Sequence, residues 1–142
     1  MGKALGGAIV AIALVMLPVG AAQATSTAVT GTVNAAGIVY WGTTFRYHAT
    51  SGAISMSNVN YPTWCSSGSG FECNWLHAGL RNTSNTQITQ VGYYFPVNTY
   101  AKNFVLSGGS TVIPAGSYAI NYAASSSSTG PFPWSWTATY NY

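Results

Sequence analysis

The sequence predicts an all-β protein: a small, mainly antiparallel β-sandwich or partly open barrel with one short-range disulfide, preceded by a cleaved signal peptide. Three observations support this prediction. From residue 25 onward, apolar side chains recur with period two far more often than with the helical period of about 3.6. Turn-forming residues separate these runs at strand-like spacing. The two cysteines, Cys65 and Cys73, are close enough in the chain to close a single short loop.

The beginning of the chain has the form of an export signal. Lys3 precedes an apolar run over 4–17, and Ala-Gln-Ala at 22–24 has the small-x-small pattern that signal peptidase reads. We therefore expect 1–24 to be a signal peptide and 25–142 to be one secreted β domain, extracellular or at the cell surface. A retained membrane anchor is the alternative, which the cleavage-like ending disfavours. We expect no membrane insertion after signal removal.

The expected strands follow from local alternation between turns. In the last one, Trp134, Trp136, Ala138, Tyr140 and Tyr142 alternate with Ser, Thr and Asn. The Pro-x-Gly turn at 114–116 leads into the strand before it. Asn82-Thr83-Ser84 is a glycosylation sequon by pattern, but so short a motif recurs by chance, and we interpret 82–85 as a turn. In order, the expected extended segments are 27–33, 37–41, 43–49, 53–59, 74–80, 87–97, 104–106, 111–113, 118–122 and 134–142.

The aromatic face of the final strand has two interpretations. Its rings either fill the core between two sheets or lie exposed as a stacking platform. Because the chain after residue 24 is poor in Leu, Val and Ile, it needs large rings inside, where each contributes a few kcal/mol. We therefore predict that Trp134, Trp136 and Tyr140 are buried.

The segment 64–75 is the most distinctive stretch of the chain. A disulfide between Cys65 and Cys73 would close a nine-residue ring and stabilise the fold by about 2.5 kcal/mol. The simplest interpretation is a surface hairpin pinned by that bond. A sharper one makes it a recognition surface, with Trp64, Trp75, Phe71 and Glu72 as the ligand-binding residues. A metal site from Cys65, Cys73 and His77 is disfavoured, because the cysteine spacing is unusual for zinc and a fourth ligand is not evident.

Charge and carboxylate counts exclude several function classes. After residue 24 the charged side chains are Arg46, Arg81, Lys102 and Glu72, too few cations for a nucleic-acid partner. Glu72 is the sole carboxylic side chain, which excludes two-carboxylate glycosidases and Ser-His-Asp triads. His48 and His77 lack a Gly-x-Ser-x-Gly elbow and are interpreted as structural. We expect no enzyme activity, catalytic residue, cofactor or metal.

What replaces charge is a surface of Ser, Thr, Asn, Gly and aromatic residues. Such surfaces bind through neutral hydrogen bonds and flat rings. The expected function is therefore a secreted, non-catalytic binding protein that recognises a surface glycan or an extracellular protein partner. One alternative is a structural subunit of an extracellular or cell-surface assembly, including a secreted toxin complex, with self-association or a hetero-oligomer. A second is a protease inhibitor that presents the Cys65–Cys73 loop.

Overall fold

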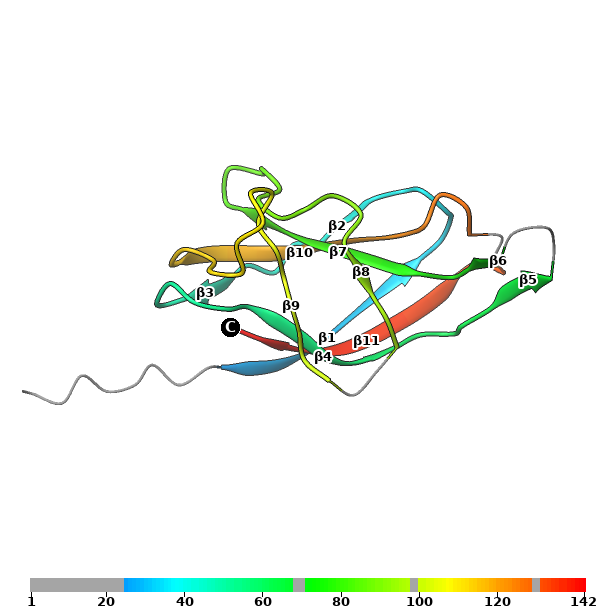
Figure 1. Ribbon diagram of the computed structural model, residues 1–142, viewed down its shortest axis with the longest axis horizontal. Helices are drawn as coiled ribbons and strands as arrows, with labels where there is room; N and C mark the ends of the chain where they lie inside the picture. The colour runs from blue at the N-terminus through cyan, green and yellow to red at the C-terminus, as the bar shows by residue number, and fades with distance from the viewer. Residues whose placement is uncertain (1–24, 68–70, 98–99, 129–130) are drawn as a thin grey trace, which may run out of the picture.

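The computed structural model of the chain describes residues 25–67, 71–97, 100–128 and 131–142, with the backbone alone at 65–67 and 71–73 (Figure 1). The expected signal peptide at 1–24 lies outside these residues. Within them the chain forms strands and no helix, and two antiparallel sheets face each other in a sandwich-like arrangement. The prediction of an all-β, antiparallel fold is confirmed. No helix that could cross a membrane occurs in the described part of the chain.

The chain passes repeatedly between the two sheets. Sheet A contains, in spatial order, β1 (Ser26–Val33), β11 (Trp134–Asn141), β4 (Ser55–Asn60) and β9 (Lys102–Asn103). The strands of sheet B are β2 (Tyr40–Trp41) and β3 (Arg46–His48), which both pair with one side of β10 (Gly116–Ala124), then β7 (Leu76–Asn82) and β8 (Tyr94–Phe95). A separate hairpin at one end of the molecule consists of β5 (Cys65–Ser67) and β6 (Phe71–Cys73) (Figure 1).

The core is built from the inward face of β11, as the sequence predicted. Trp134, Trp136, Ala138 and Tyr140 are buried, whereas the residues between them face outward. The Trp136 ring meets the Tyr122 ring edge-on, with centroids 5.1 Å apart. Such ring pairs add about 0.5–1.5 kcal/mol to the free energy gained from burying their area. The aromatic face of the last strand is therefore structural.

The size of these rings constrains the neighbouring edge strand. β1 pairs with β11 over its whole length, so Gly31 lies opposite Trp136. A Cβ at Gly31 would come within 2.5 Å of the Tyr122 ring and 2.6 Å of Trp136 Nε1. Only glycine lets the backbone approach the rings this closely.

The outward face of sheet A carries uncharged polar side chains that bond to one another. Ser26 Oγ donates to Asn141 Oδ1 at 2.7 Å. From β4, Asn58 Nδ2 donates to Thr139 Oγ1 at 3.2 Å. This charge-poor face therefore meets water through hydroxyl and amide groups.

The segments expected at 37–41 and 43–49 form shorter strands than predicted. Gly42 continues the register of β2 on β10, and its N–H donates to Ile120 O at 3.0 Å. A Cβ at Gly42 would lie 2.2 Å from that oxygen. Residues 43–45 then face the single residue 119 before β3 begins at Arg46 opposite Tyr118, so this irregular stretch shortens both expected strands.

The orientation of β3 also differs from the usual pattern of apolar residues inside and polar residues outside. Arg46 and His48 point inward, and the Arg46 guanidinium lies 5.6 Å from the centre of the Tyr140 ring. Phe45 and Tyr47 point outward, and Tyr47 is 66% exposed. The aromatic residues of this segment are thus displayed on the surface.

Three further expected strands are largely irregular. In 87–97 only β8 is a strand, because Thr89 Oγ1 replaces a backbone carbonyl and accepts from Leu80 N at 2.9 Å, and Gly92 has a positive φ of 69°. The segments 104–106 and 111–113 contribute single bridges, Leu106 to Thr89 and Ile113 to Gly52. Side-chain hydrogen bonds here take the place of continuous ladders.

Replacing Tyr140 by Phe is expected to maintain or raise the free energy of unfolding. The Tyr140 hydroxyl is buried and has no hydrogen-bond partner among the described residues, and such an unpaired group costs about 1–3 kcal/mol. Tyr140→Ala, the matched large truncation, should instead cost about 3–5 kcal/mol. Urea unfolding of both variants measures this difference. A Tyr140→Phe protein clearly less stable than the wild type would contradict it.

The same variant has a predicted effect at alkaline pH. Burial raises the pKa of Tyr140 and of Tyr61 above the ordinary value of about 10. The unfolded chain therefore loses these protons first, and stability should fall as the pH rises above about 10. Tyr140→Phe should make this fall shallower. An unchanged slope would show that Tyr140 does not titrate in this way.

Candidate functional site

Cationic side chains in this protein contact aromatic rings. Arg46, Arg81 and Lys102 each lie over at least one ring. The sole carboxylic side chain of the sequence, that of Glu72, lies outside the described residues, so no acidic side chain is described near any of the three. Attraction between a cation and a ring is worth about 0.5–2 kcal/mol, depending on burial.

Arg81 is fully engaged by its surroundings. It projects from the outward face of β7, and its Nε donates to Asn121 Oδ1 at 3.1 Å. Its two terminal nitrogens donate to Asn85 Oδ1 and to Gly42 O. The guanidinium also lies 5.3 Å from the Trp41 ring centre and 4.9 Å from that of Phe45. Arg81 is therefore a structural anchor for the β2–β3 connection.

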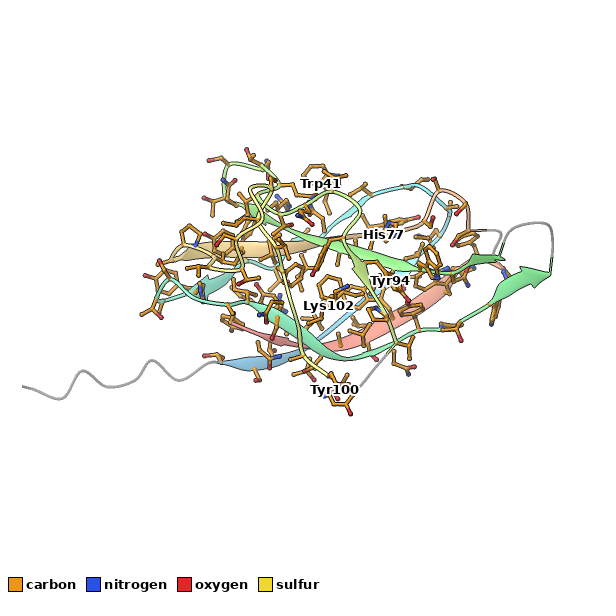
Figure 2. All side chains as sticks on the ribbon, in the orientation of Figure 1. Trp41, His77, Tyr94, Tyr100 and Lys102 are labelled. Carbon is orange, nitrogen blue, oxygen red and sulfur yellow. The ribbon has the colours of Figure 1, made fainter. Side chains whose placement is uncertain are left out.

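Lys102 also anchors neighbouring strands, on the other side of the sandwich. From β9 of sheet A, its Nζ donates to Tyr94 O on β8 of sheet B. The ammonium lies 4.5 Å from the centre of the Tyr93 ring, and Figure 2 shows Lys102 next to Tyr94. Burial lowers the pKa of Lys102. This side chain thus links the two edge strands and satisfies a carbonyl that β8 would otherwise leave unpaired.

Next to Arg81, a group of aromatic rings is exposed along the edge of sheet B. We call Trp41, Phe45 and Tyr47 the β2–β3 aromatic edge; they are 54%, 38% and 66% exposed. Figure 2 shows Trp41 on the opposite side of sheet B from Lys102. The rings of Trp41 and Phe45 are held by one buried cation, so they form a preorganised apolar surface.

A cleft opens beside this edge, between β1 of sheet A and β2–β3 of sheet B. Its volume is about 380 Å³, within the range of small-ligand sites. The floor contains Trp136, whose Nε1 is buried without a hydrogen-bond partner among the described residues. The lining residues are Ala28, Val29, Thr30, Trp41, Gly42, Thr43, Thr44, Arg46, Ile120, Tyr122 and Trp136.

The wall formed by β1 also presents backbone groups. Thr25 and Tyr142 exchange hydrogen bonds at 2.8 and 2.9 Å, which defines them as a hydrogen-bonded pair. Since such pairs alternate with non-bonded ones along an antiparallel ladder, the N–H and C=O groups of Ala28 and Thr30 point away from β11 toward the free edge. The cleft therefore offers donors and acceptors beside an exposed ring.

The predicted binding residues at 64–75 lie elsewhere. Trp64 and Trp75 are 40% and 41% exposed. Because Asn74 N donates to Trp64 O at 2.9 Å, Trp64 lies opposite Asn74, and Trp75 points to the other side of the hairpin. Phe71 and Glu72 belong to β6, but their side chains lie outside the description. The structure therefore does not bring Trp64 and Trp75 onto one surface.

Trp75 has other partners instead. Its ring lies 5.4 Å from that of Tyr94, which in turn meets His77 edge-on at 6.4 Å. Burial lowers the pKa of His77. Figure 2 shows His77 and Tyr94 close together on neighbouring strands. These three side chains form a second partly exposed aromatic group, near the base of the hairpin.

Sequence reasoning missed the β2–β3 aromatic edge and Arg46. The available signal was the density of rings around Arg46, with Tyr40, Trp41, Phe45 and Tyr47 in eight residues. What it could not supply was the identity of Arg81 as their partner, which comes from a strand far along the chain.

Comparison with known proteins adds no assignment: no protein-family model, curated protein or solved structure matches this chain. Nor do the described residues contain a group of three or more His, Cys, Asp or Glu side chains that could hold a metal ion. What the site can do chemically is therefore inferred from its own residues. Exposed indole and phenol rings can stack on a flat ligand, and the cleft can hydrogen-bond its polar groups.

Arg81→Lys is expected to destabilise the protein although it preserves charge. A single ammonium cannot reach the three acceptors that the guanidinium fork serves, so the free energy of unfolding should fall by about 2–4 kcal/mol. Arg46→Lys is the matched control, because Arg46 makes one hydrogen bond, to Thr44 O at 3.3 Å. Urea unfolding should separate the two variants clearly. Equal stabilities would show that Arg81 does not anchor the edge.

Proposed function

We propose that this protein is a secreted, non-catalytic binding protein that recognises a glycan through the β2–β3 aromatic edge and the adjoining cleft. The observation that carries the proposal is the exposure of Trp41 combined with its contact to a buried cation, Arg81. A ring held in this way loses little conformational entropy when a ligand stacks on it. The apolar face of a sugar ring is a suitable partner for an exposed indole.

The polar groups beside Trp41 support a glycan over an apolar ligand. Thr30, Thr43 and Thr44 line the cleft. Ala28 and Thr30 present backbone donor and acceptor groups at the free edge of β1. Sugar hydroxyls both donate and accept, so such a mixed lining suits them. The sequence's single carboxylic side chain supports binding without turnover, because general acid–base hydrolysis of glycosides uses two.

The hairpin residues form part of the same proposal as a second contact surface. Trp64 and Trp75 are partly exposed on its two sides, with Phe71 and Glu72 in its second strand. We further propose a Cys65–Cys73 disulfide. The Trp64–Asn74 hydrogen bond makes Cys65 and Cys73 the adjacent non-bonded pair, whose Cα atoms are typically about 4.5 Å apart. That separation is within the roughly 4.4–6.8 Å that a disulfide spans.

A structural subunit of an extracellular assembly is the second candidate function, and the free edge of β1 favours it. Over Ser26–Val33 this edge strand has no charged residue and no proline, the features that usually prevent pairing with another chain. Its outward N–H and C=O groups could pair with a strand of a neighbour.

Intact mass of the secreted protein tests export and the disulfide together. We expect a chain that begins at Thr25 and is two hydrogens lighter than the reduced form, with no thiol available for alkylation before reduction. A retained Met1, or two free thiols in the native protein, would contradict this part of the proposal.

Binding to a glycan array is expected for the wild-type protein, and Trp41→Ala should weaken it by about 1–3 kcal/mol with little loss of stability. Val91→Ala is the matched control, because Val91 is 90% exposed and does not line the cleft. Trp75→Ala tests the hairpin surface separately. A stable oligomer that binds no saccharide would favour the structural function instead.

A further inference from the structure

We infer that the cleft between β1 and β2–β3 binds a sugar residue that carries a carboxylate, and that Arg46 recognises its charge. The inference rests on the proposed glycan-binding function. It adds the class of glycan and the residue that selects it.

The hydrogen bonds of the described cations single out Arg46. All three guanidinium nitrogens of Arg81 donate to protein oxygens, and Lys102 donates to a carbonyl and lies among three rings. Arg46 makes one long hydrogen bond, from one terminal nitrogen to Thr44 O at 3.3 Å. A guanidinium has five N–H donors, so most of those on Arg46 have no partner in the described part of the chain.

Arg46 lies where a bound ligand could accept hydrogen bonds from these unused donors. Arg46 lines the cleft, and so do the neighbouring residues Thr43 and Thr44. On the floor, Trp136 is 1% exposed and its Nε1 has no partner among the described residues. A cation and two threonines therefore line one hollow above the Trp136 ring, and no acidic side chain is among its described lining residues.

A carboxylate satisfies this arrangement best. Its two oxygens match the planar fork of a guanidinium, and such charge-assisted pairs are roughly twice as strong as neutral hydrogen bonds. The sugar ring that bears it can contact Trp41, which also lines the cleft and is 54% exposed. An extended acidic peptide that adds to β1 is the competing occupant, but it would leave the Trp41 ring without a stacking partner.

The experiment compares two probes of similar shape, sodium D-glucuronate and its uncharged amide D-glucuronamide, by titration followed with NMR. Wild-type protein is expected to bind the carboxylate about tenfold more tightly than the amide, the effect of one charge-assisted interaction. Arg46→Gln should remove this preference, chiefly by weakening the binding of glucuronate. Lys102→Gln, which changes net charge equally on the other side of the sandwich, should retain it.

A second readout uses the wild-type protein alone, so it does not depend on the folding of any variant. Raising the ionic strength from about 0.01 M to about 1 M shortens the Debye length from roughly 30 to 3 Å. The preference for glucuronate should then fall severalfold, because the pair lies in a solvent-accessible cleft. A preference that does not change with salt would overturn the role of Arg46.

The remaining outcomes separate this inference from the proposed function. Equal binding of the two probes, or a preference that persists in Arg46→Gln, overturns the inference. So does acetate that binds as tightly as glucuronate, or a capped alanine-glutamate-alanine peptide that binds more tightly. If neither probe binds but another saccharide does, the inference fails and the proposed function stands. If no saccharide binds, both fail.

Discussion

The inward face of β11 determines how the two sheets can pack. Trp136 and Tyr140 are large and rigid, and each fills space that would otherwise need several aliphatic side chains. Trp136, together with the Tyr122 ring that packs against it, requires glycine at Gly31 of the neighbouring strand. The same rings bring an indole N–H and a hydroxyl into the interior, where neither has a partner among the described residues. A core built from rings thus gains volume but leaves two polar groups buried without a described partner.

The abundance of aromatic rings also determines the surroundings of the cationic side chains. With almost no carboxylates available, Arg81 and Lys102 lie against rings and donate to carbonyl or amide oxygens. Each thereby fixes an edge of the sandwich, Arg81 at β2–β3 and Lys102 between β8 and β9. Arg46 differs, because it combines a ring contact with unused donors in a cleft. Arg81 and Lys102 use their donors within the protein, whereas Arg46 can offer donors to a ligand, and the proposed site rests on this difference.

The long strands were predictable because apolar and polar residues alternate regularly along them. The β2–β3 aromatic edge has no such regular pattern, so the sequence did not indicate it. The face of β11 that is buried and the turn before β10 follow from local pattern alone. The edge at β2–β3 does not, because its register on β10 shifts after Gly42 and because Arg81, a partner far along the chain, contacts its rings. The sequence therefore indicated Trp64 and Trp75, which have the clearest local signature, while Trp41 depends on tertiary contacts.

The central claim is that ligand binds at the β2–β3 edge and its cleft. The most direct measurement follows the five indole N–H resonances of the ¹⁵N-labelled protein during titration with a saccharide that binds on the array. The signals of Trp41 and Trp136 are expected to shift with the same saturation curve, while that of Trp134 remains in place. Shifts confined to Trp64 and Trp75 would contradict the central claim and assign binding to the hairpin.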